Sequence, residues 1–228
     1  MKRKIVEYIK ESQTVKRNHY KIHGYVDLFI VHRLSDNINV ENVIDKLESI
    51  LSRKYFYGVD AIYIARIPEF KKREINALYK DGAIYISPNQ DSEEDMMDDF
   101  IHEVSHSVET YYQDFIYSDG EIKKEFLGKR KRLYHLMSQD NINVDMSDFL
   151  NVHYSKEFDF FLYKDVGYNR IDGHVSGLFL SPYSVTSMRE YFATGFEEYF
   201  LGDRIYLKKI SPQVYRKIKN MEEEKSEV

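Results

Sequence analysis

The sequence predicts a mixed α+β fold in which a small sheet is followed by a mainly helical region. Short runs rich in β-branched and aromatic residues lie in the first part of the chain, and helical spacing of apolar residues dominates from residue 91 onward. The chain has 228 residues, 43% of them hydrophobic, and no obvious linker or repeat. We therefore expect a single domain, with the sheet and one long helix in 1–115 and a helical part in 116–228.

Three runs predict the strands of the sheet. Gly24 to His32 and Val59 to Ala65 are β-rich, and they flank residues 38–55, whose apolar residues recur at helical spacing. Asp81-Gly82 is a turn signal, after which Ala83 to Ser87 alternates and stops at Pro88. The expected order is strand, helix, strand and then a last strand directly before the long helix.

The run from Asp91 to Phe115 predicts one long amphipathic helix. Its apolar stripe consists of Met97, Phe100, Ile101, Val104, Val108, Tyr111 and Phe115. The opposite face consists of Asp95, Asp98, Asp99, His102, His106 and Glu109. Ser92 and Asp95 resemble a capping box, which places the start of the helix. The helix is thus expected to have a buried side and an acidic side that carries two histidines.

His102, Glu103 and His106 form the pattern H-E-x-x-H on this helix. Residues four apart lie on the same side of a helix, so both imidazoles can reach one metal ion, and Glu103 stands beside it. Zinc lowers the pKa of a bound water to about 7, and a neighbouring carboxylate can take its proton and pass it to a leaving amine. The pattern predicts a zinc-dependent peptidase. The alternative is two surface histidines on a solvated acidic face.

A catalytic zinc site uses three protein ligands and keeps one position open, so a third ligand is expected elsewhere. A second helical pattern surrounds Glu190, and its apolar stripe consists of Met188, Phe192, Phe196 and Tyr199. Glu190 and Glu197 share a different face of that helix, and each is a candidate ligand. The small Ala193 and Gly195 are expected to let this helix approach the histidine helix closely.

The two motifs together resemble a known family. His102-Glu-Val-Ser-His106 followed by Glu190-Tyr-Phe-Ala-x-x-Phe is similar to the catalytic domain of anthrax lethal factor and the related clostridial Pro-Pro endopeptidases, which are gluzincin-type zincins. The resemblance implies that Glu190, rather than Glu197, is the third zinc ligand. It also implies that Tyr183, seven residues before Glu190, stabilises the oxyanion.

The resemblance further implies a zincin-like fold and a function. In zincins the strand before the active-site helix, here Ala83 to Ser87, is a sheet edge over the cleft, and an extended peptide can add to it by main-chain hydrogen bonds. The expected function is a zinc endopeptidase that hydrolyses peptide bonds in a protein or peptide substrate with metal-activated water. The alternative from a different class is a peptide-binding or regulatory module of the same fold that does not cut.

The region between the two motifs carries weaker signals. Glu121 to Ser138 predicts a basic helix, Met146 to His153 a short helix, and the glycine-containing run Asp165 to Ser181 a loop. The basic run Lys129 to Arg132 raises the question of nucleic-acid binding. In a chain of pI about 5.9, we expect it to be a solvated helix face instead.

Composition limits the remaining classes. The chain has no cysteine, which excludes cysteine peptidases and thiolate zinc sites. Lys2 to Lys4 is basic, but the residues after it lack the apolar core and the cleavage site of a signal peptide, and no segment predicts a membrane span. We expect a protein that is cytoplasmic as synthesised and that binds neither nucleic acid nor membrane. Secreted relatives leave room for export as an effector or toxin, and the sequence does not indicate an oligomeric state.

Overall fold

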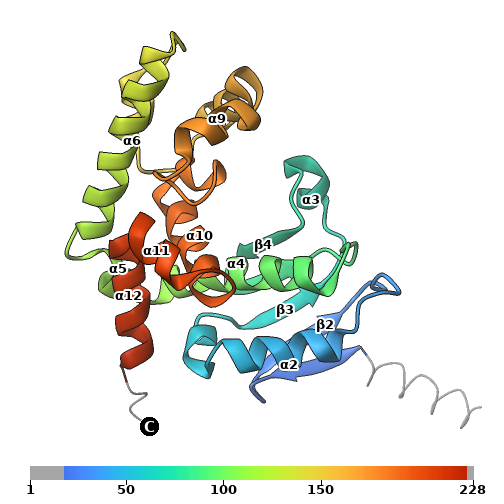
Figure 1. The fold of residues 1–228 in the computed structure, drawn as a ribbon. Coiled ribbons are helices and arrows are strands. Elements are labelled where there is room, and N and C mark those ends of the chain that lie inside the picture. Colours follow the sequence, from blue (N-terminus) through green and yellow to red (C-terminus); the bar gives the residue numbers. More distant parts are fainter. Residues whose placement is uncertain (1–17, 225–228) are drawn as a thin grey trace, which may run out of the picture. The chain divides into compact units, whose positions relative to one another are not determined.

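The computed structural model describes residues 18–224, and the basic run Lys2 to Lys4 lies outside them. The chain forms two compact units, one ending at Tyr111 and one beginning at Tyr112. All described strands belong to the first unit, and the described part of the second unit is helical (Figure 1). The mixed α+β class expected from the sequence is confirmed. No helix in residues 18–224 has the length and apolar character that a membrane crossing needs.

The first unit contains one five-stranded sheet. Its strands are β1 (His19–Ile22), β2 (Val26–Ile30), β3 (Ala61–Ile64), β4 (Ala77–Lys80) and β5 (Ala83–Ile86). The strand order is β1-β2-β3-β5-β4, with parallel pairing of β2 with β3 and of β3 with β5. The outer strands β1 and β4 pair antiparallel with their neighbours. Strands were thus predicted correctly near β2, β3 and β5, whereas β1 and β4 were missed.

The described part of the first unit also contains four helices. They are α2 (Val40–Ile50), the 3-10 helix η1 (Arg53–Phe56), α3 (Pro68–Arg73) and α4 (Glu93–Tyr111). Alternate strand residues are fully buried on the inner face, namely Leu28, Ile62, Ile64, Ile84 and Ile86. Helix α4 packs against β4, β5, α2 and η1. The sheet therefore supports α4 along its length.

The edge of the sheet differs from the prediction. β5, which we expected at the edge, is an inner strand between β3 and β4. The reason is the Asp81–Gly82 turn, whose residues have φ of 51° and 81°, as in the tight turns that join two antiparallel strands. This turn folds β4 back onto β5 as a hairpin. The sequence of β4, Ala-Leu-Tyr-Lys, lacks the alternation that indicated β5, and β4 forms one edge of the sheet.

Helix α4 matches the predicted long helix in position, with two corrections. The Asp95 N–H donates to Ser92 Oγ at 3.0 Å, which bears out the predicted cap. The helix ends at Tyr111, which is 56% exposed, so Tyr111 does not belong to the buried stripe. The acidic face is not uniformly solvated either, because Glu103 and His106 are only 7% and 6% exposed. This burial contradicts the alternative of two ordinary surface histidines.

The second unit is built from helices. They are α5 (Gln113–Tyr117), α6 (Glu121–Gln139), α7 (Met146–Leu150), α8 (Lys156–Phe160), the π-helix η2 (Phe161–Gly167), α9 (Tyr168–Val175), the 3-10 helix η3 (Tyr183–Val185), α10 (Met188–Phe200), α11 (Arg204–Ile210) and α12 (Pro212–Glu223). Three aromatic rings pack together in its core: Phe126 of α6, Tyr191 of α10 and Phe179 in the segment after α9. Their ring centroids lie 5.3 to 6.2 Å apart.

The predicted loop Asp165 to Ser181 is wrong, because η2 and α9 occupy much of it. Ile171 and Val175 are buried four residues apart, which is a helical spacing. Three glycines in the run gave it the composition of a loop. The helix α6 and the short helix α7 were predicted correctly.

The basic run Lys129 to Arg132 is a solvated face only in part, because Lys131 and Arg132 are exposed whereas Lys129 is half-buried and Arg130 is buried. Arg130 is fully buried: its guanidinium lies 4.4 Å from the Phe158 ring centroid and donates to the Asn151 carbonyl. The Lys129 ammonium donates to the Ile210 carbonyl, and burial lowers its pKa to about 8. Lys129 and Arg130 therefore point toward the interior of the second unit. The run does not form a continuous basic surface.

Candidate metal centre

Helix α4 places the H-E-x-x-H residues together. His102 is half-buried and His106 is buried, and their rings meet edge to face with centroids 4.8 Å apart. This is the arrangement that residues four apart on a helix are expected to have. Glu103 is buried one position along the same turn. The pattern read from the sequence thus corresponds to adjacent side chains.

Small polar side chains on α4 donate hydrogen bonds to main-chain carbonyls of the same helix. The Ser105 hydroxyl donates to the His102 carbonyl at 2.5 Å, and the Thr110 hydroxyl donates to the His106 carbonyl at 2.8 Å. Gly58 lies directly against the helix, because a Cβ added there would stand 2.6 Å from Ser107 Oγ. The absence of a side chain at Gly58 is therefore what allows the loop before β3 to touch α4.

Two acidic residues near the histidines have defined neighbours. Glu109 Oε2 lies 3.8 Å from His106 Nδ1, which is close to the imidazole but too far for a direct hydrogen bond. Asp99 accepts a 2.7 Å hydrogen bond from the Gln90 amide at the beginning of the helix. Of the two, Glu109 is therefore the one whose carboxylate lies beside a candidate metal-binding histidine.

Glu190 is placed by the first turn of α10. Ser187 caps this helix and accepts a 3.1 Å hydrogen bond from the Glu190 N–H, and Glu190 is 8% exposed. The sequence Ser-x-x-Glu is a capping-box pattern that we had not recognised. The expected role of Gly195 is corrected: its missing side chain lets α10 approach α12, because a Cβ there would stand 2.5 Å from Val214 Cγ1.

Tyr183 is held in the short helix η3, which packs against α10. Its carbonyl accepts hydrogen bonds from the Thr186 N–H at 3.0 Å and from the Thr186 hydroxyl at 2.8 Å. The chain then passes directly into the Ser187 cap. Tyr183 and Glu190 are thus carried by one continuous, internally bonded segment.

The structure groups three of the predicted site residues. His102, His106 and Glu190 each offer one ligand atom, and these atoms lie within 4.8 Å of one another. A tetrahedral ion with bonds of about 2.1 Å holds its ligand atoms about 3.4 Å apart. This group could hold a metal ion. Glu197, the rival candidate, does not belong to it.

Sequence reasoning missed one neighbour of Glu103. The Glu103 carboxylate accepts a hydrogen bond from the main-chain N–H of Tyr79 on β4. No side-chain pattern could reveal this contact, since the donor is a backbone group on a strand that was itself not predicted.

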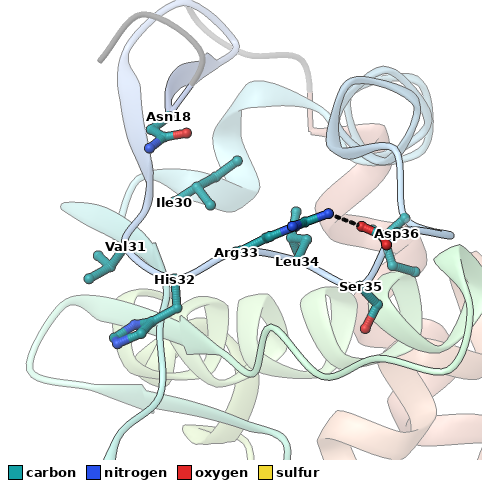
Figure 2. Close-up of a pocket in the computed structure, with 9 residues that line it drawn as sticks. Asn18, Ile30, Val31, His32, Arg33, Leu34, Ser35 and Asp36 are labelled. Atoms are coloured by element: carbon teal, nitrogen blue, oxygen red, sulfur yellow. Dashed lines mark hydrogen bonds and ion pairs between the residues drawn. The ribbon is translucent and has the colours of Figure 1, made fainter. Parts of the chain in front are cut away.

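A hollow elsewhere in the first unit is separate from these residues. It is lined by Asn18 and the segment from Ile30 to Ile38, where β2 ends and the chain turns toward α2 (Figure 2). Within it, Arg33 pairs with Asp36 at 2.5 Å, and both side chains are largely exposed. An exposed pair of this kind stabilises little. No residue that lines this hollow belongs to the group that could hold a metal ion.

The comparisons with known proteins add no relative. A scan of protein-family models and searches of the curated proteins and of the solved structures found no match to this chain.

Proposed function

We propose that this chain is a zinc-dependent endopeptidase of the zincin type, in which His102, His106 and Glu190 hold the zinc ion. The observation that carries the proposal is the grouping of two imidazoles and a carboxylate within 4.8 Å. This donor set is typical of catalytic zinc sites, where three protein ligands leave a position for reaction. Glu103, next to His102 on α4, supplies the carboxylate that such chemistry needs.

The proposed roles follow from the chemistry of peptide hydrolysis. When bound, zinc supplies Lewis acidity and makes water a nucleophile at neutral pH. Glu103 accepts the proton of the attacking water and delivers it to the nitrogen of the leaving amine. The Tyr183 hydroxyl donates a hydrogen bond to the oxyanion of the tetrahedral intermediate. The roles of Tyr183 and Glu190 also draw on the resemblance to gluzincins.

The proposed substrate is a protein or peptide segment in extended conformation. We place it along β4 rather than β5, because β4 is the outer strand next to α4. Strand addition at this edge would use the outward main-chain groups of β4 other than the Tyr79 N–H, which already donates to the Glu103 carboxylate.

The first experiment measures zinc. Purified wild-type protein is expected to contain about one zinc per chain by elemental analysis, and Glu190→Ala is expected to lose most of it. Glu197→Ala is the matched control, because it removes the same carboxylate two turns further along α10 and should keep its zinc. Zinc lost in Glu197→Ala and retained in Glu190→Ala would contradict the ligand assignment.

The second experiment measures cleavage. Wild-type protein and Glu103→Gln are incubated with an unbiased peptide library, and new termini are identified by mass spectrometry. The proposal expects wild-type cleavage that disappears in the variant while its zinc remains. Equal cleavage by both would refute the role of Glu103. Zinc and peptide binding without any wild-type cleavage would instead favour the non-proteolytic binding module.

A further inference from the structure

The main-chain groups of β4 point alternately toward and away from β5. The Ser87 N–H donates to the Asn76 carbonyl at 2.7 Å, which makes these residues a hydrogen-bonded pair. In an antiparallel ladder the next pair, Ala77 with Ile86, is then not hydrogen-bonded, and neither is Tyr79 with Ile84. The N–H groups of Ala77 and Tyr79 therefore point to the outer side of the sheet.

The outward N–H of Tyr79 meets the Glu103 carboxylate. Tyr79 is also fixed at its other end, because its hydroxyl donates to the Gly58 carbonyl at 3.1 Å. Gly58 in turn lies against Ser107, one helical turn after Glu103. One residue of the edge strand is thus tied to α4 at the carboxylate and, through Gly58, one turn beyond it.

We propose that the main-chain N–H of Tyr79 positions the Glu103 carboxylate for proton transfer, so that Tyr79 is a positioning residue of the active site. This inference rests on the proposed peptidase function. A glutamate side chain has several rotatable bonds, and a fixed donor on a buried carboxylate selects one orientation. The donor is backbone, so it holds whatever side chain stands at this position.

Proline can remove this donor selectively. The Tyr79 N–H takes no part in the β4–β5 ladder, and proline is tolerated on edge strands where the N–H points outward. Tyr79→Pro deletes both ring and N–H, whereas Tyr79→Ala deletes the ring alone, so the difference between them isolates the N–H. Ala77→Pro is the matched control, because it removes the neighbouring outward N–H that Glu103 does not use.

The expected result is a loss in kcat with little change in KM. Tyr79→Pro should turn over roughly 10- to 100-fold more slowly than Tyr79→Ala, as expected for one hydrogen bond to a charged group. Zinc content should stay at the wild-type level in both and in Ala77→Pro, which shows that a proline on this strand does not by itself disrupt the fold. Equal kcat values for Tyr79→Pro and Tyr79→Ala would overturn the inference.

A second measurement does not require turnover. Amide hydrogen exchange, read by NMR, should show the Tyr79 N–H protected in the wild type and exchanging at least about tenfold faster in Glu103→Ala, with Ala77 unchanged. An unprotected Tyr79 amide in an active peptidase would overturn this inference and leave the proposed function standing. A protected amide in a chain that binds no zinc and cleaves nothing would overturn the proposed function and the positioning role together.

Discussion

Replacing Gly195 with alanine tests the packing of α10 on α12 directly. The new Cβ would stand 2.5 Å from Val214 Cγ1, 3.4 Å from Val214 Cβ and 3.6 Å from Leu207 Cδ1. The closest atom is more than an ångström inside ordinary contact, and Val214 is a stiff, fully buried β-branched residue that cannot turn aside. Overpacking of this kind costs about 1–3 kcal/mol, while removing glycine from a helix interior returns about 1 kcal/mol. We expect a net loss of up to about 2 kcal/mol.

Gly128→Ala is the matched control for this test. Gly128 also lies inside a helix, α6, but a Cβ there would meet nothing within 4 Å. It should therefore stabilise the protein by up to about 1 kcal/mol, and the two variants should differ by the overpacking cost of about 1–3 kcal/mol. Urea unfolding of the zinc-free proteins measures both. If Gly195→Ala were as stable as Gly128→Ala, α10 could not lie as close to α12 as the structure has it.

Three further predictions concern the site, the second unit and the hairpin. Tyr183→Phe should lower kcat by about 100-fold with KM nearly unchanged, because an oxyanion donor acts mainly in the transition state; steady-state kinetics on a cleaved library peptide checks this. Burial lowers the pKa of Lys129 from 10.5 to about 8, so the folded chain loses this proton before the unfolded chain does. Its contribution to the free energy of unfolding therefore rises between about pH 8 and 10.5, and urea unfolding at pH 8 and 10 should show that Lys129→Met lacks this rise. Gly82→Ala should destabilise the first unit more than Gly24→Ala, since both have positive φ but only Gly82 lies against Asp60; thermal unfolding compares them.

The helices that carry the motifs were predictable because their signals are long and local. The run from Asp91 covers several turns of apolar periodicity and begins at a recognisable serine cap, so α4 could be placed to within a few residues. β4 could not be predicted in the same way. Its Asp81–Gly82 turn was visible, but four residues without strict alternation do not show which segment pairs across that turn.

For the site, the sequence predicts candidate residues within each helix but not which of them lie together. Periodicity gives Glu190 and Glu197 the same helix face, and the choice between them came from the resemblance to a family. The burial of Arg130 had no local signal at all, because the rings around it include Phe158 on another helix, distant in the sequence. Such contacts depend on the tertiary packing of helices that are distant in the sequence. No short sequence pattern predicts that packing.

The bond between Tyr79 and Glu103 has a consequence beyond catalysis. An unpaired edge strand is a template on which other protein chains can aggregate, and natural sheets commonly guard such edges with a charge. β4 is short, and its outward N–H at Tyr79 already faces a carboxylate. Glu103 therefore occupies one of the main-chain donors through which a strand of another molecule could pair with this edge. Removing it should make the protein more prone to self-association as its concentration rises.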